Sequence, residues 1–425
     1  MKKLVTLFLV CCFLAGNAYG SGFQLNEHGA RAMAMAGAFT GLANDPTAIY
    51  FNPAGITQLT GTNFSVGGTM IMPLATYKFP KPSTSETEML GQTFALINFY
   101  VTHQLSNKFS VGLSVNNQYG LGTKWDPNWV GKYLAVETSV KTFFFTPVIA
   151  FKLSDNFSIS AGPTIAMGSV KIARKVPNAV NPLAPDFMLT MESNTATAIG
   201  FTAGILYKPS KEWQFGLSYR SQSKFDFTGT ATSNPASFTF VHPVLKVPIT
   251  VPWPNGSIKA PLTTPQNATF GIAYLPNDQW TATFDFQYVG WSSYDKLSVT
   301  FDNYNPASPT FTGSSTQSTD RKYQNTFIVR LGFEYKATDN FAVRFGALYD
   351  HNPVQDQYVE PSLPDADRFG LNIGFGGKLS EHLSIDIAYM FLSFADRQVN
   401  NSVFGFNGTY SNQAHLFALN FNYSL

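Results

Sequence analysis

Six segments of this chain alternate apolar and polar residues, and each follows a short polar turn. After the first turn, Phe109, Val111, Leu113 and Val115 are apolar, and the residues between them are small or polar. Successive side chains of a β-strand point to opposite faces, so the alternation predicts strands with one apolar and one polar face. The six turns lie at residues 105–109, 153–157, 209–213, 276–280, 337–341 and 379–383.

The spacing of these turns favours a membrane barrel over a soluble sandwich. Their first residues lie between 42 positions (337 to 379) and 67 positions (209 to 276) apart, which leaves room for two long strands and a long loop. Short turns at one end and long loops at the other are typical of outer-membrane barrels, whereas a sandwich has shorter strands with turns about every 8 to 12 residues. Six short turns and two free ends predict an all-β fold: a closed, antiparallel, 14-stranded transmembrane β-barrel. The long connections are expected near residues 78–90, 121–137, 172–190, 228–264, 292–319, 351–365 and 396–411.

Residues 1–20 have the pattern of a secretory signal peptide. Lys2 and Lys3 precede an apolar core at residues 4–14, and Ala18-Tyr19-Gly20 matches a cleavage site. The core is too short for a membrane anchor, which needs about 20 apolar residues. A lipoprotein anchor at Cys11 or Cys12 is disfavoured because each cysteine follows a bulky residue.

Composition narrows the class further. Only 13% of the residues are charged and 15% are aromatic, which suits a lipid-facing surface. Both cysteines lie in the signal peptide, so disulfides and cysteine-ligated metals are excluded from the mature chain, and we expect no cofactor. Cleavage leaves 26 basic and 26 acidic residues, and this neutral balance predicts no nucleic-acid partner. No later stretch has 18 or more apolar residues, so a closed barrel is the remaining way to span a bilayer.

Residues 21–60 differ from the rest of the chain. They are rich in Ala, Gly and Met, they lack alternation, and they contain turn signals at 45–46 and 52–55. Residues 29–39 are expected to form a short helix. Wide barrels are often plugged by such segments, so we expect an N-terminal helical hatch at 21–60 and the barrel at 61–425.

Three sequence elements carry a resemblance to a known family. They are Gly-Phe-Gln-Leu-Asn-Glu at 22–27, Asn-Pro-Ala at 52–54 and Pro-Asp-Ala-Asp-Arg-Phe at 364–369. Together, in this order on a fourteen-strand pattern, they resemble the FadL family of outer-membrane long-chain fatty-acid and hydrocarbon transporters, over residues 21–425. One departure is the C-terminus, where such barrels usually end in an aromatic residue and this chain ends in Leu425.

The resemblance implies that the mature N-terminus reaches into an apolar pocket. Ser21, Gly22 and Phe23 are therefore candidate ligand contacts and gate elements; the alternative for Phe23 is packing against the wall. Asn52, Pro53 and Ala54 are candidates for a stopper behind an opening in the wall, and the alternative is an ordinary Asn-Pro turn.

A break in the third strand is expected at residues 117–120, because Gly120 permits the backbone angles of a bulge. The alternative is that the strand ends there. Pro147 and Pro163 are predicted to lie almost opposite each other on neighbouring strands, and neither can donate a ladder hydrogen bond. We hypothesise that this weakened stretch of wall contributes to lateral passage.

The alternation also predicts which charged residues face the lumen. Arg368 carries the third family element, with Asp365 and Asp367 beside it. Internal ion pairs are one interpretation of this set, and a cation that holds a carboxylate head group is the other. The complete set is Arg220, Arg330, Arg344, Arg368, Lys378, Asp285, Glu334, Asp350 and Asp386.

The connection at 228–264 is apolar for an exposed segment, with Phe238, Phe240 and Trp253 among its side chains. A long exposed apolar patch usually marks a binding surface, so we interpret this loop as a ligand-capture surface. The alternative is a loop folded over its own barrel mouth.

These observations predict a non-enzymatic, passive transporter in the outer membrane of a Gram-negative bacterium. Its partners would be a long-chain fatty acid or another hydrophobic small molecule, together with outer-membrane lipid and lipopolysaccharide, and it would act as a monomer. A general porin and a structural or adhesin barrel are the alternatives. An outer-membrane hydrolase is disfavoured because the chain has six histidines but no G-x-S-x-G element and no metal-spaced histidine pair.

Overall fold

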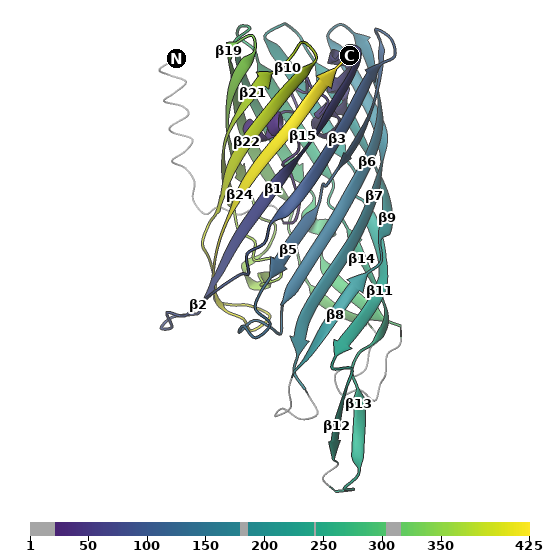
Figure 1. Cartoon of the computed structure of the whole chain (residues 1–425), viewed down its shortest axis with the longest axis vertical. Helices are drawn as coiled ribbons and strands as arrows, with labels where there is room; N and C mark the ends of the chain where they lie inside the picture. Colours follow the sequence, from purple (N-terminus) through teal and green to yellow (C-terminus); the bar gives the residue numbers. More distant parts are fainter. Residues whose placement is uncertain (1–21, 179–185, 242–243, 303–315) are drawn as a thin grey trace.

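Fourteen antiparallel strands form a closed barrel in the computed structural model, which describes residues 22–178, 186–241, 244–302 and 316–425 (Figure 1). The last strand pairs with the first from Ser424↔Asn63 to Thr409↔Lys78, which closes the wall within one chain. The predicted strand number is therefore confirmed. In order around the barrel the strands are β1 (Thr62–Lys78), β3 (Phe94–Gln104), β4 (Phe109–Asn116), β6 (Glu137–Ser154), β7 (Phe157–Val176), β9 (Ala196–Tyr207), β10 (Trp213–Arg220), β15 (Asn267–Tyr274), β16 (Trp280–Val289), β19 (Thr326–Thr338), β20 (Phe341–Asp350), β21 (Arg368–Lys378), β22 (Leu383–Phe394) and β24 (Gly408–Ser424).

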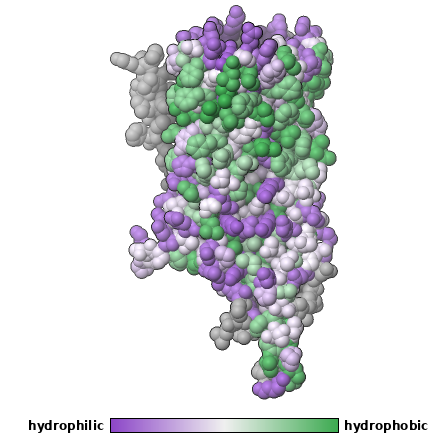
Figure 2. All heavy atoms as spheres, viewed as in Figure 1, coloured by the Kyte–Doolittle hydropathy of each residue, from purple (hydrophilic) through white to green (hydrophobic). Residues whose placement is uncertain are grey.

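The alternation places apolar side chains outside and small or polar ones inside. Along β21, Phe369, Leu371, Ile373 and Phe375 are exposed outward, whereas Asn372 is buried in the lumen. Figure 2 shows the outward apolar side chains gathered in a band toward the short-turn end of the molecule. Outer-membrane barrels expose such a band to lipid and have short periplasmic turns, so the short-turn end is the periplasmic end.

Toward the long-loop end the wall continues in shorter strands, where the sequence predicted loops. These strands pair as an extension sheet in the order β7, β8, β11, β14, β17, β18, and β5 pairs with β6. The connections expected near 121–137, 172–190, 228–264 and 292–319 are thus partly strand, which corrects the prediction. The added strands are β5 (Gly120–Lys124), β8 (Phe187–Ser193), β11 (Lys224–Asn234), β14 (Gly256–Thr263), β17 (Lys296–Phe301) and β18 (Thr316–Asp320).

Four shorter strands complete the set. β2 (Glu86–Glu88) pairs with β1, and β23 (Arg397–Val399) pairs with β24. β12 (Ser237–Val241) and β13 (Pro248–Pro252) form a separate hairpin that projects beyond the barrel at the long-loop end (Figure 1).

The segment before β1 folds inside the barrel near the periplasmic end. It contains α2 (Ala30–Ala34), α3 (Ala48–Phe51) and the 3₁₀ helix η1 (Pro53–Gln58), and their apolar residues are buried (Figure 1). Among the described residues, no helix is long and apolar enough to cross a membrane.

Buried ion pairs fix this segment to the wall. Arg31 of α2 pairs with Glu334 at 2.9 Å, Arg344 pairs with the same Glu334 at 2.6 Å, and Arg344 also pairs with Asp386 at 2.6 Å. The predicted internal ion pairs are therefore present for these wall residues. Lys378, in contrast, is exposed at the periplasmic end of β21.

Candidate ligand-binding site

The third strand of the wall breaks where the sequence predicted it. β4 ends at Asn116, which pairs with Phe144, and β5 begins at Gly120, which pairs with Lys141. Three residues of this strand therefore face two residues of β6, which is the count of a β-bulge. On the other side β3 pairs with β4 only from Phe99 to Gln104, and within the described residues its first part has no ladder with β5.

Polar side chains bridge this gap in the wall. Asn117 accepts a hydrogen bond from the backbone of Ile97 at 3.0 Å and donates one to the backbone oxygen of Thr142 at 2.6 Å. The hydroxyl of Thr142 donates to the Tyr119 oxygen at 2.6 Å. The opening is thus held by side chains instead of a continuous backbone ladder.

The N-terminal segment lies along this break. The Gly120 amide donates to the Phe23 oxygen at 3.0 Å, and the Leu25 amide donates to the Gln118 oxygen at 2.9 Å, with Gln24 forming an antiparallel bridge to Tyr119. A Cβ at Gly120 would lie 2.8 Å from a Leu25 methyl carbon, so a glycine permits this close approach. The expected gate segment and the expected break are therefore in direct contact.

Two residues of the third family element hold the start of this segment. The Gly22 amide donates to Asp365 at 2.6 Å, and the Gly22 oxygen accepts from Arg368 at 2.5 Å. Arg368 also pairs with Asp365 at 2.9 Å. We call Asp365 and Arg368 the clamp. Ser21, the remaining candidate of this group, lies outside the described residues.

Phe23 is buried in an aromatic cluster that the sequence did not predict. Its ring contacts Trp291 at 4.7 Å, Tyr294 at 5.7 Å and Tyr119 at 6.2 Å between centroids, each edge to face. Trp291 belongs to the 3₁₀ helix η2 (Trp291–Ser293) between β16 and β17.

Phe23 separates two apolar cavities. The first, the wall cavity, has a volume of about 500 Å³ and lies between the N-terminal segment and the break, with Phe94, Tyr119, Gly120 and Arg368 in its lining. The second, the outer cavity, has a volume of about 220 Å³ and lies under the extension sheet. Phe23, Leu121, Val140 and Leu363 line both, so movement of Phe23 would change the passage between them.

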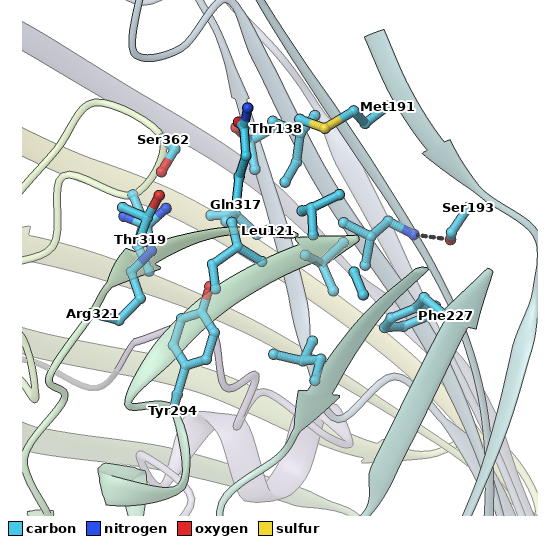
Figure 3. A pocket seen from close by; sticks show the side chains of 18 of the residues that line it. Leu121, Thr138, Met191, Ser193, Phe227, Tyr294, Gln317, Thr319, Arg321 and Ser362 are labelled. Carbon is cyan, nitrogen blue, oxygen red and sulfur yellow. Dashed lines mark hydrogen bonds between the residues drawn. The ribbon is translucent and has the colours of Figure 1, made fainter. Parts of the chain in front are cut away.

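The outer cavity is mostly apolar, and its polar side chains, such as Ser193, Gln317 and Arg321, stand at separate places around it (Figure 3). Leu121, Met191 and Phe227 line its apolar part, and Arg321 and Thr319 lie together on the other side. Its charged lining residues are Arg174, Arg321 and Glu360.

The charges of the outer cavity do not balance. Arg321 forms an ion pair with Glu360, and among the described residues Arg174 has no carboxylate within ion-pair distance. The Arg174 Nε is buried and has no hydrogen-bond partner in the described chain. An unpaired guanidinium in an apolar cavity is suited to a carboxylate, which it binds with two parallel hydrogen bonds.

Two titratable hatch residues have pKa values shifted by burial. Glu27 lines the wall cavity, and burial raises the pKa of its carboxyl above the ordinary value. Burial lowers the pKa of His28 to about 3, so this imidazole is neutral at physiological pH. Neither group therefore behaves as an ordinary surface residue.

Asn52, Pro53 and Ala54 bond within the hatch and to the wall strand β9. The Asn52 amide donates to the Thr40 oxygen at 3.0 Å and to the Ile205 oxygen of β9 at 2.9 Å, while its oxygen accepts from the Ala54 amide at 3.3 Å. None of these three residues lines the wall cavity. Their contacts include those of a turn that fastens the hatch to β9, and the role of a stopper stays a prediction.

Pro147 and Pro163 lie opposite each other, in agreement with the sequence count. The β6–β7 ladder stops at Phe145↔Ile165 and resumes at Ile149↔Ala161, so both prolines fall in the interruption. The cause is covalent, because proline has no amide hydrogen to donate. Neither proline lines the wall cavity.

The expected capture residues occupy two different environments. Phe238 and Phe240 lie on the projecting hairpin and stack at 6.1 Å, each half-buried. Trp253 is buried and stacks on Phe187 of β8 at 4.4 Å. Trp253 therefore packs the base of the hairpin against the extension sheet and is not exposed for capture. The prediction was wrong here because Trp253 stacks on β8, a strand that the sequence analysis had assigned to a loop.

A closed barrel with a lipid-facing band, an internal N-terminal segment and two apolar cavities defines a plugged outer-membrane barrel. The chain matches the family described as "Outer membrane protein transport protein (OMPP1/FadL/TodX)" over residues 11–425, and it belongs to that family. It is accordingly an outer-membrane transport protein.

Individual relatives are distant in sequence but cover nearly the whole chain. A "Long-chain fatty acid transport protein" of Salmonella typhi is 25% identical over 436 residues, covering 98% of this chain and 97% of the relative. The structure of a Pseudomonas aeruginosa FadL homologue has a TM-score of 0.79 at 22% identity and covers 95% of this chain and 100% of its own. The Ralstonia pickettii toluene transporter TbuX has a TM-score of 0.69 at 18% identity, with 93% and 98% covered.

Proposed function

We propose that this protein takes up long-chain fatty acids or similar hydrophobic compounds passively, through a pocket gated by its N-terminal segment. The observation that carries the proposal is the place of Phe23, which lines both apolar cavities and contacts the wall break through its backbone. The ligand named for the Salmonella typhi relative is consistent with it.

Apolar burial supplies the affinity that such a ligand needs. Burying one methylene contributes roughly 0.8 kcal/mol, so a sixteen-carbon chain would gain on the order of 10 kcal/mol before ordering costs. Release from so favourable a site requires a change of shape. Movement of residues 22–25 away from the break would supply that change.

The charged part of the outer cavity favours a ligand with a carboxylate. Arg174 lies in the cavity lining without a carboxylate partner among the described residues, while Arg321 and Glu360 already form a pair. A fatty acid would place its head group at Arg174 and its chain toward Leu121 and Phe227. A hydrocarbon such as toluene would use the apolar part alone.

The exit that we propose is the gap between β3 and β5. The N-terminal segment bonds to residues 118–120 there, and the clamp holds its first described residue. Release of the clamp would let Phe23 and Leu25 leave the break together. The ligand would then pass from the wall cavity through the wall into lipid.

Capture at the surface is assigned to the projecting hairpin. Its exposed apolar residues include Val241, Leu245 and Val247, and Phe238 and Phe240 stack beside them. Contiguous apolar side chains on a water-facing surface are typical of binding surfaces. The proposed path of the ligand therefore runs from the hairpin through the outer cavity and the wall cavity to the lateral exit.

A general porin is less consistent with this architecture, because the internal segment is fixed by buried ion pairs across the lumen. One chain closes the wall by itself, so no second copy is needed to complete the barrel. The proposed transporter acts as a monomer with outer-membrane lipid and lipopolysaccharide around it. No residue is assigned to catalysis in this proposal.

Equilibrium titration of the delipidated protein in detergent with palmitate tests the proposal, with the Phe23→Ala and Arg174→Gln variants measured beside it. We expect saturable binding, weakened at least tenfold by Phe23→Ala. We expect Arg174→Gln to weaken palmitate binding but not toluene binding. Lys175→Gln is the matched control, since Lys175 is on the same strand and outside the cavity lining. Absence of saturable binding of both ligands would refute the transport site.

A further inference from the structure

A third cavity lies at the periplasmic end, apart from the two apolar ones. Its volume is about 940 Å³, it is open to solvent on one side, and it lies between the end of the hatch and three neighbouring periplasmic turns. Its lining is polar, unlike that of the other cavities. The lining residues are Asn44, Thr57, Gln58, Thr60, Gln104, Asn107, Lys108, Lys152, Leu153, Ser154, Asp155, Asn156, Ser158, Leu206 and Lys208.

This periplasmic cavity has an excess of positive charge. Three lysines line it, at positions 108, 152 and 208, against the single carboxylate of Asp155. Lys152 pairs with Asp155 at 2.9 Å, but the Asp155 side chain is 95% exposed, so water screens this pair. Lys108 and Lys208 remain as cations that Asp155 does not neutralise.

Lys208 is the lysine best placed to hold a ligand. Its ammonium is half-buried and donates to the neutral amide oxygen of Gln58 at 3.0 Å. Burial, together with the charge of Lys152, lowers the pKa of Lys208 from its ordinary value. An arriving anion would relieve both effects, because it supplies the missing negative charge.

Gln58 connects this lysine to the interior of the hatch. Its amide nitrogen donates to the backbone oxygens of Leu42 and Ala43, each at 3.0 Å, while its oxygen accepts from Lys208. Asn44, which also lines the cavity, accepts from Arg31 at 2.8 Å. The cavity is therefore in contact with the same residues that fix the hatch to the barrel.

We propose that this cavity is a binding site for an oxyanion, a phosphate or carboxylate group, held by Lys208 and Lys152 with Lys108 at the rim. Ammonium groups are compact point charges that suit phosphate. The Ser158 hydroxyl, which accepts from Thr57 at 2.8 Å, adds a donor. The cavity is far larger than inorganic phosphate, so a phosphate with an attached organic group also fits.

Binding there would act on the hatch. An anion draws the Lys208 ammonium away from Gln58. Gln58 then keeps only its hydrogen bonds to the backbone oxygens of Leu42 and Ala43. Any effect of the anion on the hatch implies an equal effect of hatch position on anion affinity, because the coupling of two equilibria is reciprocal. The site is thus a means for periplasmic solutes to bias the plug, independent of the ligand that the barrel transports.

Site-specific amine acylation, read by mass spectrometry, tests the proposal on the full protein. Inorganic phosphate at millimolar concentration is expected to slow acylation of Lys208 at least threefold and to leave Lys211 unchanged. Lys211 lies in the same turn, outside the cavity lining, and so reports screening alone. Equal slowing of both lysines would overturn the proposal.

Two further experiments are needed. One identifies the source of the anion, and the other uses a variant that keeps Lys208 and its partner Gln58. Protection by soluble phosphate identifies a free solute, whereas protection only in phosphatidylglycerol nanodiscs identifies a lipid head group; protection in neither overturns the site. In a Lys152→Gln variant, which leaves Lys208 and Gln58 intact, the phosphate concentration for half-protection of Lys208 should rise at least threefold. Lys211→Gln should leave it unchanged.

Discussion

The backbone amide of Gly22 donates a 2.6 Å hydrogen bond to the carboxylate of Asp365, 343 residues later in the chain. Arg368 completes the contact by donating to the Gly22 oxygen at 2.5 Å. The start of the hatch and the end of a long loop are thereby joined beside the wall cavity. Loss of this contact would release the segment that lies along the wall break.

The Asp365→Asn variant tests the clamp directly. It removes the charge of the acceptor and the ion pair with Arg368, and hydrogen bonds to charged groups contribute about 1.5–3 kcal/mol. We expect amide hydrogen exchange of the peptide at residues 22–28 to accelerate roughly ten- to a hundredfold. Asp302→Asn is the control, since Asp302 pairs with Lys259 at 3.0 Å instead. Unchanged exchange in Asp365→Asn would contradict the clamp.

Gly22→Ala tests whether the N-terminal segment needs its present path. Gly22 has φ +63°, and a Cβ there would lie 2.6 Å from a ring carbon of Trp291. Strain of this kind costs about 1–3 kcal/mol. We expect palmitate affinity in detergent titrations to fall as it does in Phe23→Ala. Gly91→Ala should have no effect, because a Cβ at Gly91 meets nothing within 4 Å.

The stability of the protein should depend on pH through Asp367. Burial raises the pKa of this carboxyl to about 7, although the Tyr349 hydroxyl and the Asn352 amide donate to it. The folded state therefore binds the proton more tightly than the unfolded chain, so stability falls as pH rises from about 4 to about 7 and then levels off. The melting temperature in detergent should drop between pH 5 and pH 8, and Asp367→Asn should reduce that drop. An equal drop in both proteins would be evidence against this assignment.

Glu334→Gln should loosen the hatch and spare the barrel. Glu334 is 3% exposed and receives both Arg31 and Arg344, and removal of one partner from a buried ion pair costs about 3–5 kcal/mol. We expect faster hydrogen exchange in residues 30–51 with little change in the wall strands. Lys259→Gln breaks an exposed pair with Asp302 and should shift stability by less than about 1 kcal/mol.

The paired prolines 147 and 163 offer a separate test of the wall. Both fall in the interruption of the β6–β7 ladder. If this weak stretch contributes to lateral passage, Pro147→Val and Pro163→Val together should slow fatty-acid uptake by cells severalfold at equal expression. Uptake equal to that of the parent protein would assign the prolines to folding or to the bend of the wall alone.

The sequence predicted the features that depend on local chemistry. Alternation along residues 109–115 follows from lipid on one side of a strand and a polar lumen on the other, so it predicts which side chains point outward. The number of strands could be counted from the turns. The break before Gly120 was also predicted, although the structure shows Gly120 permitting the close approach of Leu25 and not a left-handed backbone angle.

The remaining features depend on contacts between distant segments. Asp365 lies within a recognised element, but its bond to Gly22 requires the folded loop. Trp253 was predicted to be exposed because its partner Phe187 belongs to a strand that the sequence presents as loop. Arg174 was missed because a cation at the end of a long strand resembles an ordinary surface residue, and only the outer cavity distinguishes it.

If the ligand leaves through the wall break as proposed, the position of the break along its strand determines which half of the bilayer receives the ligand. The break at residue 117 lies eight residues beyond Phe109, the exposed aromatic residue at the periplasmic end of β4. At about 3.3 Å per residue and a tilt of about 40°, it stands roughly 20 Å above that interface in an apolar band of about 25 Å. A ligand that leaves there enters the outer leaflet. Its transfer to the inner leaflet then depends on flip-flop of the protonated acid, because a charged head group is costly at the bilayer centre.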